Sequence, residues 1–156
     1  MKNTPLLIIL VLLLSSSCNT NDDNRNNEVN DPIIGKWIFG DVTYTFNNGE
    51  KSTIIASECT LKSNYEFKTD NTFELISYIE DTNDECELES SLEYAVWSKI
   101  STNSYLLTTK FPEQDEEVGT ISVIFPSDKT MIWIDDEPGF HNGKEFVLEE
   151  YYFTKE

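Results

Sequence analysis

Short segments rich in β-branched and aromatic residues recur at close intervals along most of this chain of 156 residues. They are residues 36–46, 64–68, 72–80, 92–100, 105–111, 119–125, 130–136 and 145–155. Segments of this length and composition, separated by turn residues, are typical of β-strands. Because the sequence shows neither an internal repeat nor a convincing helical pattern, it predicts one all-β domain.

Alternation of apolar and polar residues supports the strand assignment. Ile121, Val123 and Phe125 face one way, and Thr120 and Ser122 face the other, as expected of a strand with one buried face. In segment 92–100 the same count gives an apolar face that leaves Trp97 on the polar side; that face is formed by Leu92, Tyr94, Val96 and Ile100. Segment 145–155 carries aromatic residues on both faces.

The connections between segments are mostly short and contain turn-forming residues. Thr69–Asn71, Ser101–Asn103 and Pro126–Asp128 are examples, in which Asp and Asn side chains stabilise turns. Short connections join antiparallel neighbours. The sequence therefore predicts an antiparallel up-and-down β-barrel of about eight strands, in which closure removes the exposed edges. Residues 47–63 fit either a short helix or an extra strand.

The N-terminal segment has the order of parts found in a secretory signal. Lys2 precedes an uncharged apolar run, Leu6–Leu14, which is followed by small residues at Ser15–Ser17. The run is too short to span a bilayer, which needs about 20 apolar residues. We therefore expect residues 1–17 to be a signal peptide.

The residue after this segment is Cys18, and the stretch LLLSSSC resembles the lipobox of bacterial lipoproteins. The resemblance implies that Cys18 becomes the first residue and carries the lipid that attaches the protein to a membrane. It also implies a place in the cell envelope of a Gram-negative bacterium, at the outer membrane, facing either the periplasm or the surface. An ordinary cleaved signal without a lipid is the alternative.

A lipid on Cys18 also bears on the pairing of the two other cysteines. The chain has three cysteines, so a lipid on Cys18 leaves Cys59 and Cys86 as a pair. Export would place them in an oxidising compartment, where a disulfide persists. Residues 18–31 are polar and rich in asparagine, which predicts a flexible tether ahead of a domain at 32–156.

The charge of the chain excludes two classes of partner. The formal net charge is −18 at pH 7. Such a charge repels nucleic acid and anionic lipid headgroups, so we expect no nucleic-acid partner. The sequence names no protein partner.

Two motifs resemble the lipocalin-like domain of bacterial lipoproteins. Gly35-Lys36-Trp37 matches the G-x-W signature of the first strand, and the ordered set continues through Cys59, the stretch YEFKTDNTFEL, Cys86 and Trp97. The resemblance implies that Trp37 plugs the closed end of a barrel. Lipocalins cover this tryptophan with an arginine from the last strand. The only arginine here is Arg25 in the tether, so the resemblance leaves Lys155 as the candidate for that place, without arginine's planar stacking.

The same resemblance implies non-catalytic binding of a small apolar or amphipathic ligand in the barrel mouth. The expected lining residues are Phe39, Tyr65, Phe67, Phe73, Leu75 and Trp133. A barrel of about eight strands can instead be filled by side chains. The alternative function is therefore an interaction module that binds an envelope protein or a glycan through its outer face.

Signals of catalysis and metal binding are weak. The single histidine, His141, lies in a turn-like segment without a nucleophile motif. The acidic stretch around Asp81 lacks the glycine and the final glutamate of a calcium-binding EF-hand loop, so solvated loops explain the acidic clusters better. We expect no enzyme, no cofactor and no metal site.

Overall fold

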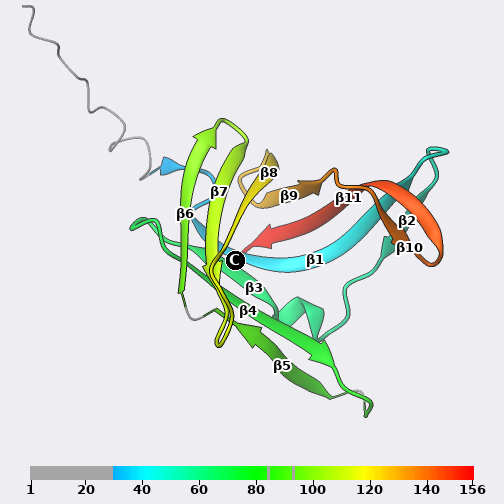
Figure 1. Ribbon diagram of the computed structural model, residues 1–156, viewed down its shortest axis with the longest axis horizontal. Helices are drawn as coiled ribbons and strands as arrows, with labels where there is room; N and C mark the ends of the chain where they lie inside the picture. The colour runs from blue at the N-terminus through cyan, green and yellow to red at the C-terminus, as the bar shows by residue number, and fades with distance from the viewer. Residues whose placement is uncertain (1–29, 84, 93) are drawn as a thin grey trace, which may run out of the picture.

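The computed structural model describes residues 30–83, 85–92 and 94–156 as an antiparallel, all-β structure (Figure 1). The predicted signal peptide, Cys18 and nearly all of the predicted tether lie outside the described residues. No helix in the described part of the chain is long and apolar enough to cross a membrane.

Each of the eight predicted segments contains a strand. The matching strands are β1 (Gly35–Phe46), β3 (Asn64–Phe67), β4 (Phe73–Glu80), β6 (Tyr94–Ser101), β7 (Ser104–Lys110), β8 (Glu117–Ser127), β9 (Thr130–Asp135) and β11 (Lys144–Lys155). The sequence did not predict β5 (Cys86–Ser91) or β10 (Gly139–His141). The ambiguous stretch 47–63 contains both expected elements, the strand β2 (Lys51–Ile54) and the 3-10 turn η3 (Thr60–Lys62).

The strands form one 11-stranded sheet in the order β5-β4-β3-β1-β11-β9-β8-β7-β6, with β2 beside β1 and β10 beside β11. The first and last long strands, β1 and β11, are therefore neighbours, as an up-and-down barrel requires. In Figure 1, β6, β7, β8 and β9 lie on one side of this central pair, and β3, β4 and β5 lie on the other.

The prediction of a closed barrel was wrong. β5 pairs with the far half of β4, Ile76–Glu80, whereas β6 approaches β4 only at its start. β5 ends at Ser91 and β6 begins at Tyr94, yet these two strands are the opposite ends of the sheet and do not pair. Within the described residues, the ladder contact across this seam is the isolated bridge between Thr72 and Val96. A short connection therefore does not join neighbouring strands at this point.

β1 and β11 extend beyond the rest of the sheet and carry β2 and β10, so that these four strands form a projecting arm (Figure 1). β10 turns into β11 through Asn142 and Gly143, which have φ values of 51° and 75°. An Asn-Gly pair readily adopts this left-handed backbone, and it is the residue pair that favours a tight hairpin.

The sheet curls around one hydrophobic core, and we call the face toward this core the inner face. Its most buried large side chains are Trp37, Tyr105, Phe67, Phe153, Ile33, Met131 and Val123. Trp97 also belongs to this core, with only 2% of its surface exposed, whereas Tyr94 and Ile100 are 48% and 56% exposed. The face predicted for segment 92–100 was therefore wrong: the buried indole, which donates a hydrogen bond of 3.1 Å to the carbonyl of Lys68, decides the orientation.

Trp37 lies at the end of the core where the domain begins. Its indole nitrogen donates a 2.6 Å hydrogen bond to the carbonyl of Ile33, and the Lys155 ammonium lies 4.8 Å from its ring centroid. Gly35 makes this contact sterically feasible, because a Cβ there would meet Lys155 Cε at 2.5 Å. Gly35 also has a φ of 128°, which non-glycine residues rarely adopt.

Candidate functional site

A cavity of about 280 Å3 opens from the inner face between β3 and β4 on one side and β7, β8 and β9 on the other. Its walls are mainly apolar. The lining residues are Tyr65, Phe73, Leu75, Leu92, Leu107, Thr109, Phe111, Glu117, Val118, Gly119, Ile121 and Trp133. These side chains come from strands far apart in sequence, and the curl of the sheet brings them together.

The structure brings together four of the six residues predicted to line a ligand site: Tyr65, Phe73, Leu75 and Trp133. The rings of Tyr65 and Trp133 lie 5.6 Å apart, between centroids, across the inner face. The other two are elsewhere. Phe67 is a core residue with 1% of its surface exposed, and Phe39 packs edge-on against Phe153 at 5.1 Å.

Sequence reasoning missed the residues that come from β7, from β8, from the connection between them and from the connection before β6. They are Leu92, Leu107, Thr109, Phe111, Glu117, Val118, Gly119 and Ile121. The alternation in β8 identified Ile121 as buried, and extending it by one step toward the N-terminus reaches Gly119. A glycine inside a strand often marks a place where another group approaches closely. The sequence alone could therefore have drawn attention to Gly119.

Gly119 leaves space on the inner face. It is the register partner of Leu107, whose side chain is buried in the core, so a side chain at 119 would point inward as well. A Cβ added to Gly119 would meet no heavy atom within 4 Å. Gly119 is itself exposed, so the absent side chain leaves open space where the cavity meets solvent.

Tyr65 places a polar group in this apolar setting. Its side chain is partly buried, and burial raises the pKa of its hydroxyl to about 12, so the phenol is neutral at pH 7. Among the described residues, none forms a hydrogen bond with this hydroxyl. This hydroxyl is not one of the fully buried polar atoms that lack a partner, so water or a bound molecule can reach it.

A second hollow of about 390 Å3 lies at the seam between β4 and β6. It shares Phe73, Leu75 and Leu92 with the first cavity. The unpaired part of the seam therefore adjoins the wall of the cavity. Its two charged lining residues, Lys68 and Glu74, form an ion pair with each other.

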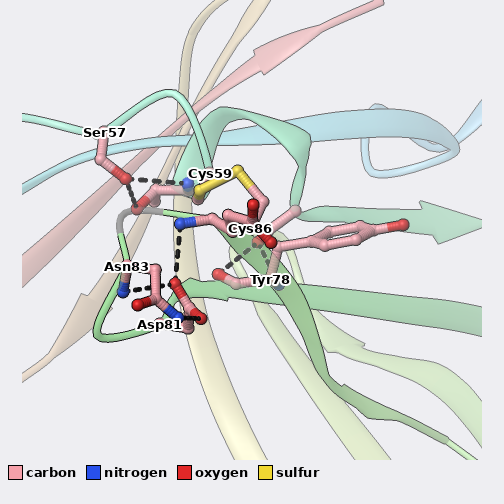
Figure 2. The surroundings of a disulfide bond; sticks show 9 residues. Ser57, Cys59, Tyr78, Asp81, Asn83 and Cys86 are labelled. Atoms are coloured by element: carbon pink, nitrogen blue, oxygen red, sulfur yellow. Dashed lines mark hydrogen bonds between the residues drawn. A yellow bond between two sulfur atoms is a disulfide. The ribbon is translucent and has the colours of Figure 1, made fainter.

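The predicted disulfide between Cys59 and Cys86 is present, with a Cα–Cα distance of 5.2 Å (Figure 2). It joins the residue just before η3 to the first residue of the end strand β5. Next to it, the Asp81 carboxylate accepts backbone hydrogen bonds from Asn83 and Glu85 at 2.8 and 2.7 Å and closes the β4–β5 turn (Figure 2). These bonds lower the pKa of Asp81. The bridge ties the end of the sheet to the chain beside β1.

Asp31, at the end of the predicted tether, is buried with 6% of its surface exposed. Its carboxylate accepts hydrogen bonds from the Tyr105 hydroxyl at 2.5 Å and from the Lys99 ammonium at 2.6 Å. Burial, followed by the interaction with Asp31, raises the pKa of Tyr105 above its usual range. The carboxylate thus anchors the start of the domain to β6 and β7.

The candidate residues for other chemistry lie apart from the cavity. The His141 ring stacks on Tyr44 with 4.1 Å between centroids, on the projecting arm. Within the described part of the chain, no three His, Cys, Asp or Glu side chains come together in a way that could hold a metal ion.

Comparison with known proteins finds no matching family model and no matching curated protein. One similar solved structure is from Bacteroides ovatus and is described as a structural genomics protein of unknown function. The two chains share 11% identity with a TM-score of 0.37, over 78% of this chain and 41% of that one. The present chain thus spans less than half of that protein's length, and a likeness of this size supports no conclusion about activity.

Proposed function

We propose that this protein is a lipid-anchored lipoprotein with a lipocalin-like domain that binds a small apolar or amphipathic molecule without chemical conversion. The observation that carries the proposal is the inner-face cavity of about 280 Å3, lined by aromatic and aliphatic side chains. Ligand pockets are typically concave and mostly apolar, with a few polar groups and volumes of roughly 300–1,000 Å3. At about 280 Å3 this cavity lies just below that range, which favours a small ligand.

Two local features support a ligand rather than a packing defect. Tyr65 offers a neutral hydroxyl without a hydrogen-bond partner among the described residues. Gly119 leaves open space at a position where almost any side chain would fill it. A bound molecule would take the place of water at both positions, as a hydrogen-bond partner of Tyr65 and as a packing contact beside Gly119.

Kinship with lipocalin-like domains is part of the proposal. It is supported by the pairing of β1 with β11 and by Lys155, which occupies the place over Trp37 that the resemblance assigns to an arginine. In this proposal the Cys18 lipid holds the domain at the outer membrane, and the polar tether gives it reach.

The binding test uses the uncharged fluorescent probe N-phenyl-1-naphthylamine and two variants of the chain. Gly119→Phe places a ring in the open space on the inner face, and Thr120→Phe places the same ring on the exposed outer face as a control. We expect probe fluorescence to rise with the wild type and with T120F, and to stay flat with G119F. Equal responses of the two variants would show that the probe does not enter this cavity.

The alternative function, binding of an envelope protein or a glycan by the outer face, is supported by exposed apolar side chains. Phe140 in β10 is 77% exposed, and Ile55, just after β2, is 71% exposed. Crosslinking of the protein in intact envelopes, with Phe140→Ser and Ile55→Ser as variants, tests it. A crosslinked partner that both variants lose would favour this function over the cavity.

A further inference from the structure

The charged side chains at the cavity described above indicate which kind of ligand it favours. Among the described residues that line it, Glu117 carries the only carboxylate, and none is a lysine, an arginine or a histidine. Glu117 is exposed, as is its neighbour Val118 at 61%, so this carboxylate lies where the cavity meets solvent. A cationic group on a ligand would therefore meet a carboxylate at the mouth. An anionic group would meet no counter-ion among the described lining residues.

The aromatic walls of the cavity also favour a cationic group over an anionic one. The rings of Tyr65, Phe73, Phe111 and Trp133 line the cavity. The faces of aromatic rings carry negative partial charge and attract cations, Trp most strongly. The chain shows such a contact elsewhere, between Lys155 and Trp37. No lysine of the described chain occupies the cavity in the same manner.

The electrostatic field of the whole protein also favours a cation over an anion. A formal net charge of −18 raises the local concentration of cations and repels anions at the surface. This long-range effect is weakened by salt, whereas a contact with Glu117 inside the mouth is screened less.

From these observations we propose that the cavity selects a small organic cation with an apolar body, an alkylammonium or arylalkylammonium ion, over an amphiphile with an anionic head. The inference rests on the proposed function, because it concerns the same cavity. The ammonium would lie at the mouth, beside Glu117 and against the nearest aromatic ring, and the apolar body would lie against the remaining apolar walls.

The test compares three probes with the same apolar chain: octylammonium, octanol and octanoate. Binding is measured by calorimetry on the chain from residue 18 onward with Cys18→Ser, which keeps the tether and the domain and removes the lipid. We expect octylammonium to bind about ten-fold more tightly than octanoate, with octanol between them. The preference should persist at physiological salt.

Two isosteric variants separate a local contact from the general field. Glu117→Gln removes the carboxylate at the mouth, and Glu116→Gln removes the same charge from its neighbour outside the cavity lining. We expect E117Q to weaken octylammonium binding by up to about five-fold, as for a partly exposed ion pair, and to leave octanol binding unchanged. E116Q should affect neither probe.

Each contrary outcome has a distinct meaning. Octanoate binding as tightly as octylammonium would overturn the preference for cations while leaving the binding cavity intact. Equal effects of E117Q and E116Q would overturn the role of Glu117, because the field alone would then explain the preference. Binding of none of the three probes would overturn the proposed function itself.

Discussion

The ammonium of Lys155, the second-to-last residue of the chain, covers the indole ring of Trp37 in the first strand, 4.8 Å from its centroid. The same ammonium donates a 3.3 Å hydrogen bond to the carbonyl of Pro32. The two ends of the domain are thus fixed to each other at one end of the core. Gly35 is the third partner, because its missing Cβ leaves room for the lysine side chain.

A double-mutant cycle tests this arrangement. Gly35→Ala should destabilise the protein by at least about 1 kcal/mol, because it adds a Cβ at a positive φ and displaces Lys155. The displacement costs nothing further when the lysine is already removed. We therefore expect Gly35→Ala to cost less in a Lys155→Ala background, with a coupling of about 0.5–1 kcal/mol in denaturant titrations. Strict additivity would contradict the contact.

The buried carboxylate of Asp31 predicts a cost for its removal. Asp31→Ala leaves the Tyr105 hydroxyl and the Lys99 ammonium without their acceptor. Because Lys99 is partly exposed and regains water, we expect a loss of about 2 kcal/mol in the free energy of unfolding. The exposed neighbour Asn30, changed to Ala, serves as the control and should have no effect. A D31A variant with an unchanged free energy of unfolding would show that the tether does not contribute to the fold through this carboxylate.

The disulfide should contribute a large share of the stability. Cys59 and Cys86 are separated by 27 residues, and closing such a loop stabilises a fold by about 3.5 kcal/mol in the chain-entropy model. We expect the double variant Cys59→Ala/Cys86→Ala to unfold at a markedly lower denaturant concentration. The reduced wild type should behave in the same way, and an unchanged midpoint in both would be inconsistent with this role.

Tyr65 predicts a change of stability in alkali. Burial raises its pKa from 10.0 to about 12, so its contribution is fully present below pH 10 and is lost as the pH rises toward 12. The other tyrosines titrate equally in the wild type and in Tyr65→Phe, and their effects cancel in the difference. The stability advantage of the wild type over Y65F should therefore fall by about 2–3 kcal/mol over this interval. A constant difference would mean that this phenol is not buried.

The strands were predictable because their alternation and their turn residues are local signals. Asn71, for example, lies in the predicted turn between β3 and β4 with a φ of 67°. The short strands β5 and β10 carry no such signal, since their sequences CELESS and GFH are polar or very short. They form because longer neighbouring strands, and in β5 a disulfide, hold them in place.

Trp97 shows where counting apolar positions fails. Three apolar residues on one face of β6 predicted that this face is buried, but the opposite face, with Ala95 and Trp97, packs into the core. A buried indole removes a large apolar surface from water and has one hydrogen-bond donor to satisfy. The open seam of the sheet was also beyond local reasoning, because it depends on which half of β4 pairs with β5.

The cavity could be predicted in part. Tyr65, Phe73, Leu75 and Trp133 were identified from aromatic and aliphatic residues in alternating strands. The wall from β7 and β8 was missed because its shape depends on strand register, which sets Gly119 opposite Leu107.

The most direct test of the central claim, that the cavity holds a ligand, is native mass spectrometry of the protein purified gently from its own envelope. The account predicts an extra mass that is constant between preparations, is released by organic solvent, and is absent from the Gly119→Phe variant but present in Thr120→Phe. A clean mass without ligand, in the wild type and in both variants alike, would contradict it.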